Sequence, residues 1–179
     1  MHQVVESLTV MGCFALQAPA LGAGSQAAAE KPGIRACSLL TTELVMQVSP
    51  YEQQPPEQRD LHRQLMTQFP PEEESLGPSG SACSYGGIYL QLDPFAAPAR
   101  IEKDLAKTWG SVLSVGDVAY FRDNRGEWAE LYVRAGARVF TIQMDIPNGD
   151  LNTGVGVRTA ESIKPNVIAL AKAILPKLR

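Results

Sequence analysis

Residues 118–146 read VAYFRDNRGEWAELYVRAGARVFTIQMDI, which is three alternating runs separated by two turn-forming links. The runs are 118–122, 127–134 and 137–146, and the links are Asp123-Asn124-Arg125-Gly126 and Ala135-Gly136. Short links rich in Gly and Asn join neighbouring antiparallel strands. The stretch therefore predicts an antiparallel meander.

Alternate positions along these runs lie on opposite faces of the predicted sheet, because side chains alternate in direction along a strand. An earlier run that begins at Cys83 and ends at Asp93-Pro94 extends the same pattern. One face contains only apolar residues, as expected of a core face. They are Ile88, Leu90, Leu92, Ala119, Phe121, Ala129, Leu131, Val133, Phe140, Ile142, Met144 and Ile146.

The opposite face of the predicted sheet gathers aromatic and cationic side chains. They are Tyr85, Tyr89, Tyr120, Arg122, Trp128, Tyr132 and Arg134. Rigid rings with polar tips, next to guanidinium groups, favour recognition of a ligand or a partner chain. There are two alternatives. These residues form cross-strand pairs on an ordinary solvent-exposed face, or an insertion at residues 51–81 covers the face.

Four helices are expected around this sheet. Thr41 can cap a first, short helix. A second helix carries Leu61, Leu65, Met66 and Phe69 on one face. A third helix starts at Pro98, and a fourth helix starts at about Pro165. Residues 70–81 are rich in Glu, Pro and Gly, which predicts a mobile surface loop. The expected fold is α+β, with an antiparallel sheet of about four to five strands and the helices on one face.

The first 29 residues predict a secretory signal peptide, which leaves residues 30–179 as a single domain. The stretch from Ser7 to Ala29 holds no charged residue and changes from apolar to small and polar, although Glu6 precedes it and no Lys or Arg does. The alternatives are a terminal segment of the fold, or lipidation at Cys13, which would anchor the protein to the cell envelope. A signal peptide predicts a periplasmic or secreted protein.

Export would leave Cys37 and Cys83 as an even pair in an oxidising compartment, where a disulfide is expected. The alternative is two buried and unlinked cysteines in the cytosol.

Composition and motifs argue against several classes of function. The net charge of −3 and the pI near 5.4 do not favour nucleic-acid binding. The sequence has two His and no Gly-x-Ser-x-Gly or phosphate-loop motif, so we predict no catalytic residue, metal site or cofactor, and we expect His62 at the surface.

Several short motifs resemble small exported domains of bacterial envelope proteins, including domains of actinobacterial lipoproteins. The motifs are Cys37-Ser38-Leu39-Leu40-Thr41, Cys83-Ser84-Tyr85, Gly116-Asp117-Val118-Ala119-Tyr120 and Ala169-Leu170-Ala171-Lys172. The resemblance covers about residues 37–178. It implies an exported α+β domain with paired cysteines and no established catalytic residues.

These observations predict an exported, non-catalytic binding or interaction module that uses the aromatic sheet face. Its partner would be a small ligand, an envelope component or a second copy of the chain. The alternative is a small hydrolase-like enzyme whose residues converge only in three dimensions. A deep pocket that holds His62 or a carboxylate with a perturbed pKa would favour the enzyme.

Overall fold

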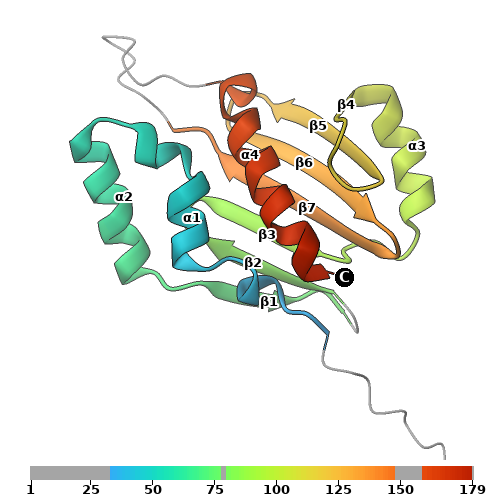
Figure 1. Ribbon diagram of the computed structural model, residues 1–179, viewed down its shortest axis with the longest axis horizontal. Helices are drawn as coiled ribbons and strands as arrows, with labels where there is room; N and C mark the ends of the chain where they lie inside the picture. Colours follow the sequence, from blue (N-terminus) through green and yellow to red (C-terminus); the bar gives the residue numbers. More distant parts are fainter. Residues whose placement is uncertain (1–32, 78–79, 148–158, 179) are drawn as a thin grey trace, which may run out of the picture. The chain divides into compact units, whose positions relative to one another are not determined.

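The predicted meander forms the centre of the sheet. The computed structural model describes residues 33–77, 80–147 and 159–178 (Figure 1). Strands β5 (Val118–Asn124), β6 (Trp128–Ala135) and β7 (Arg138–Asp145) pair antiparallel in sequence order. The core-facing residues of these strands pair directly, for example Leu131 with Ile142, so they share one face as predicted.

The described residues form seven strands in one antiparallel sheet, more than the four to five expected, in the order β1-β2-β3-β7-β6-β5-β4. The additional strands are β1 (Glu72–Ser75), β2 (Ser81–Tyr85), β3 (Ile88–Leu92) and the short β4 (Gly110–Ser111). The prediction of a surface loop over residues 70–81 is wrong, because β1 pairs with β2. Acidic residues are poor strand formers, but they suit an edge strand, where charge discourages pairing with another chain.

The run predicted as one strand from Cys83 to Leu92 is instead a hairpin. Gly86 and Gly87 form its turn, with φ of 58° and 76°, and Tyr85 pairs directly with Ile88. Positive φ at both central residues is the requirement of the tight hairpin turns that glycine favours.

The four predicted helices are present as α1 (Thr42–Val48), α2 (Pro56–Gln68), α3 (Pro98–Thr108) and α4 (Ala160–Ile174). Three short 3-10 helices accompany them: η1 (Ala36–Ser38), η2 (Pro50–Gln53) and η3 (Leu175–Leu178). Helix α4 begins before Pro165, because Thr159 and Ser162 form a reciprocal cap at its N-terminus. The region predicted as an insertion, residues 51–81, contains α2 and β1.

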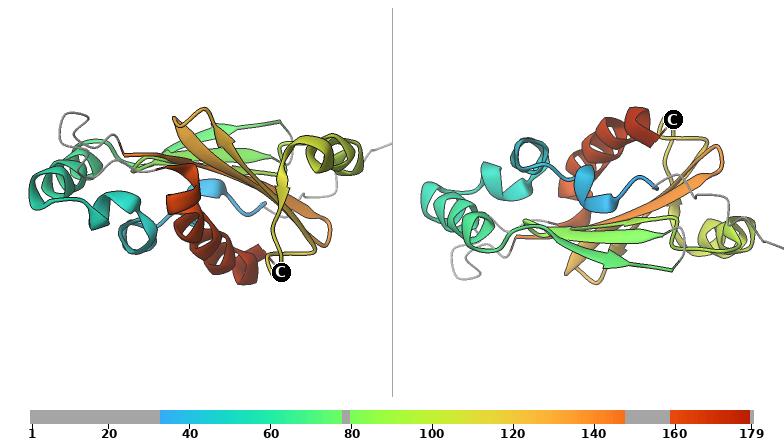
Figure 2. Two further views of the ribbon diagram at one scale, coloured as in Figure 1. Left: turned by 90° about the horizontal axis from the view of Figure 1, so that it is seen from above. Right: turned by 90° about the horizontal axis from the view of Figure 1, so that it is seen from below.

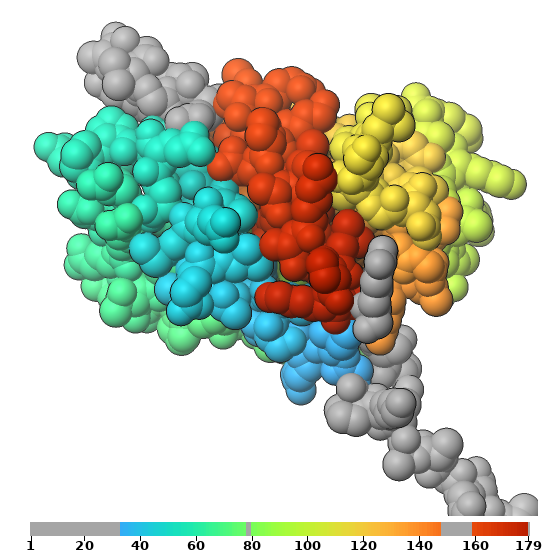
Figure 3. Space-filling model, viewed as in Figure 1, coloured from blue at the N-terminus to red at the C-terminus, as the bar shows by residue number. Residues whose placement is uncertain are grey.

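The helices do not all lie on one face of the sheet, so that part of the fold prediction is wrong. Helices α4 and α1 pack against each other over the core face (Figure 3). Helix α3 lies apart from α4 (Figure 2), and its Glu102 bonds to Tyr132 and Arg134 on the opposite face. The α+β class is confirmed.

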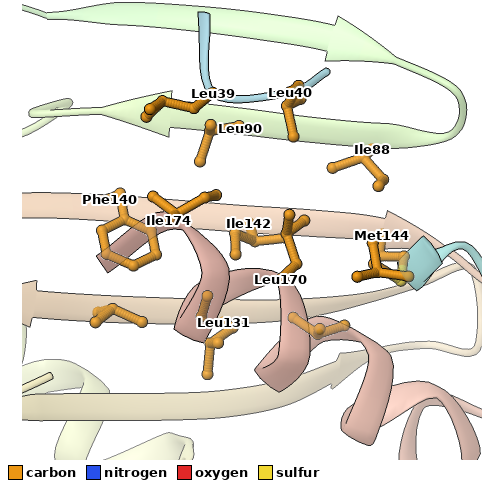
Figure 4. Packing of buried hydrophobic residues seen from close by; sticks show 14 of the residues in the cluster. Leu39, Leu40, Ile88, Leu90, Leu131, Phe140, Ile142, Met144, Leu170 and Ile174 are labelled. Atoms are coloured by element: carbon orange, nitrogen blue, oxygen red, sulfur yellow. The ribbon is translucent and has the colours of Figure 1, made fainter. Parts of the chain in front are cut away.

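One apolar core joins the sheet to α4, α1 and η1. Leu131, Phe140 and Ile142 of the sheet face Leu170 and Ile174 of α4 (Figure 4). All twelve residues predicted for the core face are buried. Burial of such side chains stabilises a fold by about 1.5–3 kcal/mol each.

The predicted disulfide joins Cys37 in η1 to Cys83 in β2, with their Cα atoms 4.9 Å apart. Disulfides persist in oxidising compartments, so the bond indicates a location outside the cytoplasm. No helix in the described part of the chain has the length and apolar character to cross a membrane. The predicted signal peptide and Cys13 lie outside the described residues.

Candidate functional site

The seven residues of the predicted aromatic face do not form one open surface. Tyr85 lies on the core side of the sheet, where it is buried and its hydroxyl is 2.9 Å from that of Thr42. The prediction that it shares a face with Tyr89 is wrong. The tight turn at Gly86-Gly87 makes Tyr85 the direct partner of Ile88, and direct partners point to the same face.

Tyr132 and Arg134 are covered by α3 and the segment that leads into it. Tyr132 is only 1% exposed, and its hydroxyl donates a hydrogen bond of 2.9 Å to Glu102. Burial, then the bond to Glu102, raises the pKa of Tyr132 far above its ordinary value. Arg134 donates to the same carboxylate at 2.7 Å, and Phe95 packs against the Tyr132 ring. These two residues hold α3 in place.

The remaining residues of the face also have partners within the chain, with one exception. Arg122 bonds to Glu130 at 2.7 Å and lies 4.5 Å from the centre of the Trp109 ring. Tyr120 packs against Tyr132, and Tyr89 donates to Glu74 at 3.3 Å. The exception is Trp128, which is partly exposed and whose indole Nε1 has no hydrogen-bond partner among the described residues.

A pocket of about 550 Å³ lies between α2 and the turn that joins β2 to β3. Sequence reasoning missed this pocket, because it expected α2 to pack with the other helices on one face of the sheet. Only Met66 of the apolar stripe of α2 is buried, whereas Leu61, Leu65 and Phe69 are 55%, 42% and 62% exposed. The pocket is lined by Tyr51, Gln58, Leu61, His62, Leu65, Met66, Phe69, Gly86, Gly87 and Asp145.

The two glycines of the turn allow close approach on both sides of this pocket. A Cβ on Gly86 would lie 2.7 Å from Val45 and 3.2 Å from Met66, so only glycine lets α1 and α2 pack on the turn. A Cβ on Gly87 would lie 3.2 Å from Asp145 Oδ2 and 3.3 Å from the Tyr51 ring. The absence of a side chain at Gly87 therefore leaves space between that carboxylate and that ring.

His62 is 7% exposed, so the prediction of a surface histidine is wrong. Its Nε2 is 3.1 Å from the carbonyl oxygen of Gly86 and donates to it, since a carbonyl only accepts. The imidazole stacks on the Tyr51 ring, with centres 4.6 Å apart and planes at 10°. His62 thus fixes both the turn and the tyrosine that form the pocket.

An ion pair between Glu52 and Arg63 lies next to this histidine, outside the pocket lining. Nδ1 of His62 is 3.8 Å from Glu52 Oε1, and both carboxylate oxygens of Glu52 accept hydrogen bonds from Arg63. The bond from Arg63 lowers the pKa of Glu52. This arrangement neutralises Glu52 outside the pocket.

Asp145 is the acidic side chain that lines the pocket. Its backbone N–H donates to the carbonyl of Gly87 at 2.9 Å, which fixes the end of β7 against the turn. Partial burial raises the pKa of its carboxyl group, and burial together with Asp145 raises the pKa of Tyr51. No cationic group in the described part of the chain lies within 4.0 Å of Asp145.

Metal-binding geometry occurs at one place in the described residues, where Cys37, Cys83 and Glu73 converge. Both sulfur atoms there are used in the disulfide, and Glu73 accepts a hydrogen bond of 2.9 Å from the backbone of Cys37. The cluster therefore connects η1 to the edge of the sheet and offers no thiolate ligand.

The fold and the pocket together define an α+β domain with one disulfide and an apolar pocket at an end of its sheet. No protein-family model, curated protein or solved structure matches the chain.

Proposed function

We propose that this protein is an exported, non-catalytic binding module whose ligand inserts an apolar group into the α2 pocket. The observation that carries the proposal is the exposure of Leu61, Leu65 and Phe69 along one wall of a concave site. Contiguous exposed apolar surface on a soluble domain typically marks an interaction site. The volume falls within the usual range for small-molecule pockets, about 300–1,000 Å³.

The free energy gained when a ligand covers Leu61, Leu65 and Phe69 is sufficient for useful affinity. Full burial of a Leu or Phe side chain gains about 1.5–3 kcal/mol. Since these side chains are about half exposed, a ligand that covers them gains about 1 kcal/mol from each. Of the seven residues on the predicted aromatic face, Trp128 remains a candidate for contact with a ligand or partner, because the others have partners within the chain.

The proposed location is the periplasm or the extracellular medium, with anchoring through Cys13 as the alternative. Support comes from the disulfide and from the resemblance to exported bacterial envelope domains. Intact-mass measurement of protein from the native host tests this proposal. The expected product lacks the first 29 residues or so and carries no free thiol. A full-length chain with free Cys37 and Cys83 would contradict it.

Binding is tested with the neutral fluorescent probe N-phenyl-1-naphthylamine, whose emission increases in apolar surroundings. The variant Leu65→Ser/Phe69→Ser should weaken binding about 30-fold, the equivalent of about 2 kcal/mol. Leu113→Ser is the matched control, because Leu113 is 86% exposed and does not line the pocket. Unchanged affinity in the double variant, or an equal loss in the control, would refute the proposal.

A hydrolase-like enzyme is the second candidate, because the pocket contains both His62 and a carboxylate with a raised pKa. Several contacts favour binding over catalysis. Nε2 of His62 is bonded to Gly86, its Nδ1 is buried, and the described lining includes no Ser, Thr or Cys nucleophile. Hydrolysis of p-nitrophenyl acetate that disappears in Asp145→Asn would favour the enzyme; we expect no such activity.

A further inference from the structure

We propose that the ligand of the α2 pocket is a cationic amphiphile, in which an ammonium group next to the apolar part contacts Asp145 and Tyr51. This inference rests on the proposed binding function and names the chemical class of the ligand. The apolar part would lie along Leu61, Leu65 and Phe69. These residues belong to α2, whose place at one end of the sheet is seen in Figure 1.

The charge of the pocket favours a cationic head group. Among the described residues, its lining contains one carboxylate, that of Asp145, and no Lys or Arg; its other ionisable side chains are His62 and Tyr51. A purely apolar ligand would take water away from this carboxylate and leave it without a partner, which is unfavourable. An anionic head group would add repulsion between like charges. An ammonium group is the head group that compensates Asp145 while the apolar wall is covered.

Asp145 differs from other carboxylates of the domain that lie near the sheet or α2. Glu130 is paired with Arg122, Glu102 with Arg134, Asp93 with Arg138, and Glu52 with Arg63. Asp145 has no such partner among the described residues, and its side chain is exposed where it lines the pocket. A carboxylate in this position attracts a cation more strongly than one in open solvent, because the effective dielectric constant is lower.

Aromatic rings lie close to the carboxylate of Asp145. The Tyr51 ring and Asp145 Oδ2 both lie within 3.3 Å of the position that a Cβ on Gly87 would occupy, so the gap between them is fixed by that glycine. Trp128 does not line the pocket, but it pairs directly with Asp145 across β6 and β7, which places its indole on the same face of the sheet. Aromatic faces around a carboxylate are the usual surroundings of bound ammonium groups.

The experiment compares three ligands with the same alkyl chain and different head groups. Decyltrimethylammonium, decyl maltoside and decanoate are titrated by calorimetry, each below its critical micelle concentration. We expect the ammonium compound to bind at least about 10-fold more tightly than the maltoside, and decanoate to bind most weakly. Equal affinities for the ammonium compound and the maltoside would overturn the inference.

Two variants test whether the preference for the ammonium head group arises at the proposed site. Asp145→Asn should remove the preference for the ammonium head group and retain binding of decyl maltoside. Glu127→Gln is the control, because Glu127 is an exposed acid next to Trp128 that does not line the pocket. Retention of the preference in Asp145→Asn overturns the inference alone. Failure of all three amphiphiles to bind overturns the proposed function as well.

Discussion

Replacement of Gly86 by alanine tests how the pocket is built. Gly86 has φ of 58°, and its added Cβ would lie 2.7 Å from Cγ1 of the buried Val45 and 3.2 Å from Sδ of Met66. The left-handed conformation costs a non-glycine residue about 1–2 kcal/mol. Overpacking against a buried β-branched side chain adds about 1–3 kcal/mol. The free energy of unfolding should therefore fall by about 2–5 kcal/mol.

Gly136→Ala supplies the matched control for this prediction. Gly136 has φ of 60°, and a Cβ there meets nothing within 4 Å, so this variant should lose only the conformational part. Urea unfolding of both variants with the disulfide intact measures the difference, which we expect to be about 1–3 kcal/mol. Equal losses would refute the packing of α1 and α2 on the turn.

Further predictions concern the disulfide, the floor of the pocket and pH. Reduction of Cys37–Cys83, which are separated by 46 positions, should lower the free energy of unfolding by about 4 kcal/mol in urea titrations, and no change would contradict a stabilising role. Gly87→Ala should abolish binding of decyltrimethylammonium, whereas Gly126→Ala, with a similar φ of 78° and open space, should retain it in the same calorimetric assay. Affinity for the ammonium compound should fall as acidification protonates Asp145, beginning at a higher pH than for an ordinary aspartate, because burial raises the pKa of this carboxyl. A profile that stays the same in Asp145→Asn would contradict the assignment of this effect to the carboxyl group of Asp145.

The central sheet could be predicted from the sequence because its signals are local. Alternation in 118–146 defines the core face, and two short links define the order of the strands. The sequence does not reveal the hairpin at Gly86-Gly87, because the alternation of residues before the two glycines and the alternation after them can be aligned as one continuous strand. That error of register moved Tyr85 to the wrong face.

The pocket could not be predicted because periodicity identifies which residues share a face but not what covers that face. The stripe on α2 resembles a core-facing stripe, yet Leu61 and Phe69 remain exposed and only Met66 reaches the core. Glu102 likewise gives no sequence signal of its contact with Tyr132, since the two are 30 positions apart. Such long-range contacts depend on the packing of whole elements.

The proposed location of the binding site is tested most directly by leucine-methyl NMR during titration with decyltrimethylammonium. The account predicts that the methyl signals of Leu61 and Leu65 shift with a single saturable dependence, and that those of Leu131 and Leu170 in the core remain unchanged. Saturable shifts at other leucines, with Leu61 and Leu65 unaffected, would contradict it.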